Sequence, residues 1–366
     1  MMAAHPPQKI TAYRHAERVV NFAPCRCYRQ RPSFTHCWNS MSAPIFKLVL
    51  GALFAFTLNL PADLAHAAAP ALSASSYPKE FRIGYQKGNS LVILKASGEL
   101  EKALAPNGVT VKWFEFPFGP PMVEALNAGD IDLGFVGSTP PVFAQAGGAP
   151  EIRYIGYAAA YKDNYAVVVP KESTARRMKD LQGKKIAVAK GSAGQYLLLK
   201  ALEQDGMKPD DIVFAYLQYS EARSAFERGD VAAWVVPDPR LADVEQNIGA
   251  RPLVTASKLT PQYSFYVAPA KFAATYPAIL RITLDKLNDT EQYAKEHADE
   301  TARFLEKDTR VPLKIWQLAL TRQAWGVAYP LPPNIVDAQQ EVANTFFRYK
   351  LIPKAVQIKD ASVSVK

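Results

Sequence analysis

The sequence predicts an α/β fold with two lobes, each a mainly parallel sheet flanked by helices, joined by two strands. Three observations carry this prediction. Short apolar strands alternate with helical periods from residue 81 onward, the same plan returns about one hundred residues later, and two extended runs ending in proline bracket the second copy. At 366 residues, 49% of them hydrophobic, the chain is long enough for two packed domains.

The first copy of the plan is strand, helix, strand, helix, strand. Its strands are expected at 82–85, 110–116 and 131–136, and its helices at 91–104 and 121–128. The second helix should end at Gly129, since glycine adopts the left-handed conformation that closes helices. This order predicts parallel βαβ units.

The second copy repeats the first at matching positions. Residues 83–90 match 186–193 as strand, lysine-glycine and helix, and residues 124–131 match 223–231 as helix, Gly-Asp stop and strand. Generic α/β chains share such patterns, which is the alternative explanation. We favour two similar lobes.

The bracketing runs set the expected domain boundaries. Residues 79–164 plus 269–366 should form lobe I, and residues 171–261 lobe II. The extended runs at 165–170 and 262–268 are interpreted as hinge strands. Two lobes joined by two strands enclose a cleft.

The segment before residue 79 is interpreted as containing an export signal and a linker. Residues 48–60 form an uncharged apolar run followed by a small-x-small cleavage pattern, which favours a signal peptide over 41–67 and a soluble exported protein. Residues 68–78 are typical of a loose linker. Residues 1–40 are interpreted as a non-native or disordered extension, with an organellar presequence as the alternative.

Most of the excess positive charge, the cysteines and most of the histidines are concentrated in residues 1–67. Of the formal charge of +9, only +4 remains after residue 67, which argues against a nucleic-acid partner. Cys25, Cys27 and Cys37 and four of the five histidines also precede residue 68. Only His297 remains, and its surroundings are typical of a surface helix, so a Ser-His-Asp or Cys-His system, a Cys/His zinc site and an internal disulfide are nearly excluded from the remainder. We expect no catalytic residue and no metal.

Three helix starts should face the cleft, because ligands of open α/β sheets bind beyond the carboxyl ends of the strands. They follow the strands at Gly88-Asn89, at Ser138-Thr139 and at Gly191-Ser192. Unpaired N–H groups and the helix dipole bind oxyanions there, although simple helix capping explains any one of them equally well. No segment matches a nucleotide-binding glycine motif.

Aromatic residues lie near these helix starts, and Phe118 is the strongest candidate for a ligand contact because it falls in a proline-rich loop. Tyr196 and Trp234 are further candidates, with burial in the core as the alternative. An anion site beside an apolar wall predicts an amphiphilic acid as ligand.

Taken together, these segments resemble the periplasmic aliphatic sulfonate-binding proteins of ABC importers, over residues 81 to about 355. The resemblance rests on the joint, ordered occurrence of several short motifs. They are Arg82-Ile83-Gly84-Tyr85-Gln86-Lys87-Gly88, Glu115-Phe116-Pro117, Ile131-Asp132-Leu133-Gly134, Pro140-Pro141, Lys190-Gly191-Ser192, Trp234, Asp238-Pro239 and Ser264-Phe265-Tyr266.

The resemblance implies a type II periplasmic binding fold without a cofactor. It implies a monomer that captures an organosulfonate and delivers it to membrane permease subunits driven by a separate ATPase. By motif position, Gln86, the Ser138 region and Gly191-Ser192 should lie at the ligand headgroup, with Trp234 and Asp238 on the opposing lobe.

Two departures from the family pattern put ligand identity in question. Members of the family commonly have Gly-Asp before the Pro-Pro helix start, where this chain has Ser138-Thr139. They also commonly have Trp-Asp-Pro where this chain has Pro237-Asp238-Pro239, so the tryptophan is replaced by Pro237. The sequence therefore favours a sulfonate or sulfate ester with a bulkier tail than taurine. The alternatives are another small anion such as taurine or nitrate, a sensor subunit, or a desulfinase-like enzyme, a class that resembles this fold but uses a cysteine nucleophile.

Overall fold

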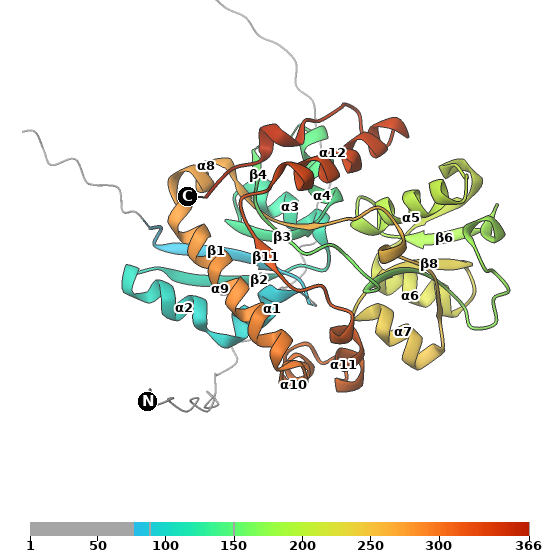
Figure 1. The fold of residues 1–366 in the computed structure, drawn as a ribbon, viewed down its shortest axis with the longest axis horizontal. Coiled ribbons are helices and arrows are strands. Elements are labelled where there is room, and N and C mark those ends of the chain that lie inside the picture. Colours follow the sequence, from blue (N-terminus) through green and yellow to red (C-terminus); the bar gives the residue numbers. More distant parts are fainter. Residues whose placement is uncertain (1–76, 88, 149–150, 366) are drawn as a thin grey trace, which may run out of the picture. The chain divides into compact units, whose positions relative to one another are not determined.

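The computed structural model describes residues 77–365 except residues 88 and 149–150 (Figure 1). The predicted extension at 1–40 and signal peptide at 41–67, and most of the linker at 68–78, lie outside the described residues. The remainder contains two sheets, one of six strands and one of five. We call the sheets with their flanking helices lobe I and lobe II.

Lobe I begins with alternating strands and helices, as the hydrophobic pattern predicts. In chain order these are β1 (Glu80–Tyr85), α1 (Ser90–Ser97), α2 (Glu99–Leu104), β2 (Thr110–Glu115), α3 (Gly119–Ala128), β3 (Leu133–Gly137), α4 (Thr139–Ala146) and β4 (Ile152–Ala158). The single helix predicted at 91–104 is two helices, because Gly98 adopts a left-handed φ of 65° between them. Gly129 ends α3 in the same way, with φ 78°.

Lobe II is one continuous stretch of chain. It contains β5 (Tyr165–Val169), β6 (Lys185–Val188), α5 (Ala193–Gln204), β7 (Val213–Tyr216), α6 (Tyr219–Glu227), β8 (Ala233–Pro237), α7 (Arg240–Ile248) and β9 (Arg251–Thr255). Short 3-10 helices lie at Met178–Leu181, Pro209–Asp211 and Ala256–Lys258.

The chain then returns to lobe I. This last part contains β10 (Ser264–Pro269), α8 (Ala270–Thr275), α9 (Pro277–Glu296), α10 (Ala298–Thr309), α11 (Leu313–Thr321), β11 (Val327–Ala328) and α12 (Pro333–Arg348). Two further 3-10 turns lie at Ala105–Asn107 and Ile358–Ala361.

The two sheets have the same strand order, which is the structural form of the sequence repeat. Lobe I is ordered β2-β1-β3-β10-β4, with β11 added at the β4 edge, and lobe II is ordered β7-β6-β8-β5-β9. The first three strands are parallel in each sheet, and the fourth is antiparallel to both its neighbours. Each sheet is thus mixed, but four of the five strands that the two sheets share run in one direction, which confirms the predicted mainly parallel lobes.

The connections between the sheets are the segments 159–164 and 256–263. The runs interpreted as hinge strands instead form paired strands, β5 inside the sheet of lobe II and β10 inside the sheet of lobe I. Their apolar residues fit sheet interiors, since both strands are buried along almost their whole length.

Helices cover both faces of each sheet, so each lobe has two apolar layers. In lobe II, Val167 and Val235 pack toward α5, whereas Val168 and Trp234 pack toward α6 and α7. Successive strand residues point to opposite faces, which explains the division. In lobe I, one layer contains α1 and α9 and the other contains α3, α4 and α12.

A partly buried ion pair ties β1 to the start of β3. The Arg82 Nη2 lies 2.7 Å from Asp132 Oδ1 and its Nε lies 3.0 Å from Asp132 Oδ2, while the Arg82 amide donates to Oδ2 over 2.8 Å. The Asp132 side chain is 8% exposed and that of Arg82 31%. Asp132 is therefore a structural partner of Arg82.

We expect Asp132→Ala to lower the free energy of unfolding by about 2–4 kcal/mol, because it leaves a partly buried guanidinium and a backbone amide without their acceptor. Urea denaturation measures this loss. Asp130→Ala, at an exposed position two residues earlier, is the control and should change stability by less than about 0.5 kcal/mol. Equal effects of the two substitutions would contradict the assignment.

Candidate functional site

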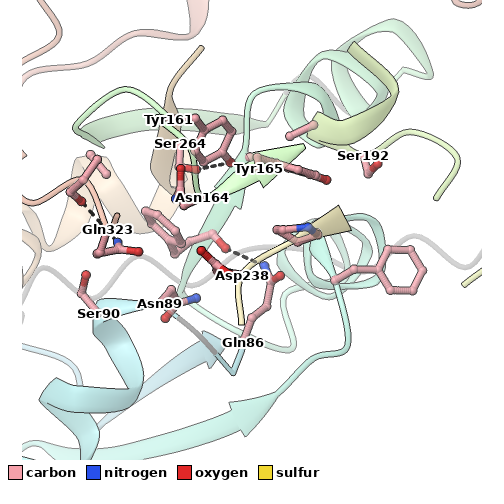
Figure 2. Close-up of a pocket in the computed structure, with 18 of the residues that line it drawn as sticks. Gln86, Asn89, Ser90, Tyr161, Asn164, Tyr165, Ser192, Asp238, Ser264 and Gln323 are labelled. Atoms are coloured by element: carbon pink, nitrogen blue, oxygen red, sulfur yellow. Dashed lines mark hydrogen bonds between the residues drawn. The ribbon is translucent and has the colours of Figure 1, made fainter. Parts of the chain in front are cut away.

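A pocket of about 130 Å³ lies where strand ends of both lobes meet the following helix starts. That is close to the roughly 150 Å³ of a cavity known to hold benzene, so a small organic molecule fits. Figure 2 shows polar side chains from several elements pointing toward one another there. Its polar and charged lining consists of Gln86, Lys87, Asn89, Ser90, Tyr161, Asn164, Tyr165, Ser192, Tyr219, Asp238, Arg240, Ser264, Glu291 and Gln323.

Five helices begin at this pocket. The lining includes the N-cap residues of three of them, Asn89 for α1, Phe118 for α3 and Ser192 for α5. It also includes the first residues of α6 and α7, Tyr219 and Arg240. The positive ends of several helix dipoles therefore meet in one small volume, which favours an anion.

Asn89 presents an unused donor. Its Oδ1 accepts from the Leu91 amide over 3.0 Å and caps α1. Its Nδ2 is buried and has no hydrogen-bond partner among the described residues. A buried donor without an acceptor is costly, so this amide group is set to bind an oxygen supplied by a ligand.

The start of α5 leaves backbone amides available. Ser192 Oγ donates to the Ala189 carbonyl over 2.7 Å, so it does not cap the helix, and the Gly191 amide donates to Gln195 Oε1 over 2.7 Å. No hydrogen bond from the Ala193 amide is found within the described part of the chain. This N–H group therefore remains for a ligand.

Tyrosine hydroxyls form another part of the wall. The Tyr161 hydroxyl lies 2.5 Å from Ser264 Oγ, and the Tyr165 hydroxyl lies 3.3 Å from that of Tyr219. Burial raises the pKa of Tyr161 to about 12 and also raises the pKa of Tyr165 and of Tyr219. All three phenols therefore stay neutral near pH 7 and can donate hydrogen bonds.

Arg240 and Lys87 are the cations of the lining. The Arg240 guanidinium lies 4.6 Å from the centre of the Tyr219 ring. Among the described residues it forms no ion pair. Lys87 is half exposed and its Nζ lies 3.4 Å from a Glu115 carboxylate oxygen. Arg240 is thus the better placed counter-charge for an anion.

Asp238 is held by an arginine that reaches across from lobe I. Arg322, just beyond α11, donates to its two carboxylate oxygens over 2.6 and 2.9 Å and to Glu245 of α7 over 2.7 Å. Asp238 also accepts from the Ala242 amide over 2.9 Å. Burial raises the pKa of the Asp238 carboxyl, and the ion pair with Arg322 opposes that shift. Asp238 therefore caps α7 and links the two lobes.

The structure brings five of the predicted site residues together in the pocket. These are Gln86, Asn89, Phe118, Ser192 and Asp238. The Gln86 side chain is oriented by a 3.0 Å hydrogen bond from its Nε2 to the Phe135 carbonyl (Figure 2). Phe118 stacks edge-on against Tyr219, with ring centres 6.5 Å apart. Gly88 lies outside the described residues.

Three predicted residues lie at the correct helix starts but outside the lining. Ser138 is fully buried, and its polar atoms are occupied, since its Oγ accepts from Gln262 over 2.8 Å and its carbonyl from Gln339 over 2.5 Å. Thr139 is fully buried beside it, and Gly191 supplies its amide to Gln195 instead of to the pocket. The pattern located these turns but could not show which atoms are already bonded.

Tyr196 and Trp234 require correction, since both belong to the core. Tyr196 is 1% exposed and packs against Phe346 of α12, and Trp234 is 1% exposed and packs against Phe226 of α6. Tyr196 lies one helical turn beyond the start of α5, and Trp234 points to the face of the sheet covered by α6 and α7.

Ten polar and charged residues of the lining were not predicted as site residues from the sequence: Lys87, Ser90, Tyr161, Asn164, Tyr165, Tyr219, Arg240, Ser264, Glu291 and Gln323. A signal existed for Tyr165 and Ser264, because both open the extended runs that bracket lobe II. Tyr219 and Arg240 open helices that follow lobe II strands, as Asn89 opens a helix in lobe I. Ligands of open α/β sheets bind beyond the carboxyl ends of the strands, and this rule applied to every strand of both copies indicates Tyr219 and Arg240 as well.

Metal ligands and membrane-spanning helices are both absent from the part of the chain that the structure describes. It contains no group of three or more His, Cys, Asp or Glu side chains placed to hold a metal ion. Within the same residues, no helix has the length and apolar character needed to cross a bilayer.

The chain forms two mixed sheets of the same topology, two connecting segments between them and a polar pocket lined by helix starts. This arrangement defines the periplasmic binding protein fold. The chain belongs to the NMT1-like family, whose model matches residues 77–306. A relative from Bacillus subtilis that carries the name putative aliphatic sulfonates-binding protein is 37% identical over 285 residues, covering 77% of this chain and 85% of the relative.

Solved structures agree with this assignment. The alkanesulfonate-binding protein SsuA from Xanthomonas axonopodis pv. citri bound to MOPS superposes with a TM-score of 0.74 at 33% identity, covering 78% of this chain and 99% of that one. The periplasmic aliphatic sulphonate binding protein SsuA from Escherichia coli gives a TM-score of 0.73 at 34% identity, with coverages of 78% and 98%.

We expect Asn89→Asp to weaken anion binding at least about tenfold, because it removes a donor and places a carboxylate at the headgroup. Aspartate caps helices as well as asparagine does, so the melting temperature should change little. Titration calorimetry with an alkanesulfonate measures the affinity.

Asn127→Asp, at an exposed position of α3, adds the same charge away from the pocket and is the control. Unchanged affinity in Asn89→Asp would show that this side chain does not bind the headgroup.

Proposed function

We propose that this protein is the solute-binding subunit of an ABC importer and captures aliphatic or related organosulfonates. It acts in the periplasm as a monomer, without a cofactor, and delivers its ligand to membrane permease subunits that work with a separate ATPase, so that the cell acquires sulfur. The family membership and the two SsuA structures support the transport role.

The observation that carries the proposal is the meeting of five helix starts at one pocket with mostly uncharged donors. A sulfonate is a permanent anion with three oxygens that accept hydrogen bonds in different directions. The Asn89 amide group, the Ala193 N–H and the tyrosine hydroxyls match that need. Each helix end contributes about 0.3–1 kcal/mol and each charge-assisted hydrogen bond about 1.5–3 kcal/mol.

The wall supports a ligand with an apolar tail. Phe118 and Tyr219 form an aromatic corner, and Phe135, Pro140 and Pro237 add apolar surface. Covering about 100 Å² of tail adds about 2.5 kcal/mol. After the cost of ordering the ligand, micromolar affinity follows. We therefore favour a sulfonate with a bulkier tail than taurine over taurine, nitrate or a sulfate ester.

The enzymatic alternative has little chemical support. A desulfinase-like reaction with a cysteine nucleophile needs a cysteine at the pocket, and the cysteines of this chain are Cys25, Cys27 and Cys37, all before the matched region. The carboxylates of the lining are engaged by other groups, Asp238 by Arg322 and Glu291 by Ser90. We propose that the ligand leaves chemically unchanged.

Titration calorimetry with hexanesulfonate, MOPS, taurine, hexanoate and nitrate tests the proposal. We expect micromolar binding of hexanesulfonate and MOPS, at least about tenfold weaker binding of taurine and of hexanoate, and the weakest binding for nitrate. Nitrate or taurine binding more tightly than hexanesulfonate would overturn the ligand class. Sulfite release during incubation with a sulfonate or sulfinate would overturn the binding role.

A further inference from the structure

Glu291 is an acidic side chain in the wall of a pocket that we assign to anions. It lies on α9, is 2% exposed and lines the pocket together with Ser90. Unlike Asp238, it has no arginine or lysine partner, and no ion pair of the described residues includes it. The role of this carboxyl is not explained by the helix starts.

Its two oxygens have different partners. Oε1 is hydrogen-bonded with Ser90 Oγ, and Oε2 accepts from the Gly326 amide over 2.5 Å. Figure 2 shows Ser90 beside Asn89 at the start of α1. The Ser90 hydroxyl therefore connects the carboxyl to the pocket that Asn89 also lines.

The charged groups on the neighbouring elements are engaged elsewhere. Lys95 of α1 pairs with Asp308 of α10, and Lys102 of α2 pairs with Glu99. The titratable group that faces Glu291 from β10 is Tyr266, whose pKa is raised by burial and, to a smaller degree, by the charge of Glu291. These contacts supply no cation that would hold Glu291 ionised.

The protonation state of Glu291 decides where the Ser90 hydroxyl points. An ionised carboxylate only accepts hydrogen bonds, so Ser90 Oγ–H must donate to Oε1 and offers the pocket no proton. A neutral carboxyl donates Oε1–H to Ser90 Oγ instead, which frees the serine proton for a ligand oxygen. The neutral form also removes a negative charge near an anionic headgroup.

We propose that capture of the anion is linked to uptake of one proton by Glu291, with Ser90 relaying the change to the ligand. This inference rests on the proposed function, because it concerns the same site. No covalent bond of the ligand forms or breaks. One proton moves from the buffer to Glu291 Oε1, and the Ser90 hydroxyl turns from the carboxylate toward the bound oxyanion.

The sign of the pH dependence follows from linkage. Burial raises the pKa of Glu291 above its ordinary value, so the neutral form persists to higher pH in the folded protein than in the unfolded chain. The stabilisation by this group is fully present below the unfolded pKa and is lost as pH rises through the folded pKa. A bound anion raises that pKa further, so affinity should fall with rising pH by up to about tenfold per unit.

Titration calorimetry of the wild-type protein with hexanesulfonate tests this inference directly. Repeating it from about pH 5 to pH 8.5 in sulfonate-free buffers of different ionisation enthalpy, such as phosphate and imidazole, gives the number of protons taken up. We expect proton uptake that rises toward one as pH passes the pKa of Glu291 in the free protein and falls again above its pKa in the complex. Difference infrared spectra should show a neutral carboxyl band appearing on binding.

Glu291→Gln fixes the neutral geometry, because its amide can donate to Ser90 and accept from Gly326. It should bind hexanesulfonate without proton uptake, with a flat pH profile and without the carboxyl band. Glu296→Gln, at an exposed position of the same helix, is the control and should behave as the wild type. Ser90→Ala should weaken binding and flatten the profile if the serine is the relay.

The outcomes separate this inference from the proposed function. Wild-type protein that binds hexanesulfonate with no proton uptake and the same profile as Glu291→Gln would overturn the inference and leave the function intact. Absence of binding to hexanesulfonate and MOPS in the wild type would overturn both.

Discussion

The pocket depends on one constraint, the unsatisfied N–H groups that every α-helix has at its first turn. Many helices satisfy one of these groups with a serine or threonine cap. Here Ser192 donates its hydroxyl to the Ala189 carbonyl instead, and Ala193 lines the pocket. The site therefore attracts an anion largely without formal charges, and a neutral site discriminates by geometry as well as by electrostatics.

The duplicated topology explains why so many helix starts meet. In each sheet the three parallel strands end at the same edge, and each is followed by a helix. The segments 159–164 and 256–263 bring those edges together, and Gln262 fixes their approach by donating to Ser138 Oγ of lobe I and to the Ala193 carbonyl of lobe II. Backbone geometry thus sets the site before any particular ligand contact is considered.

Much of this arrangement could be predicted from the sequence, and the failures have physical causes. Strand and helix periods located the turns at Asn89 and Ser192, because periodicity records which face of an element is buried. The same periodicity cannot tell a core aromatic from a pocket aromatic, so Trp234 was misplaced. Nor does it record long-range hydrogen bonds, and those bury Ser138 and bring Glu291, about 200 residues away from Ser90 in the chain, into the wall.

The position of β10 has a consequence for the order in which the protein can fold. This strand lies between β3 and β4, yet the whole of lobe II separates it from them in the chain. Lobe II is contiguous and can complete its sheet as soon as β9 is available. Lobe I keeps unpaired backbone groups on β3 and β4 until β10 is available, so its sheet cannot be completed before the whole of lobe II has emerged in the chain.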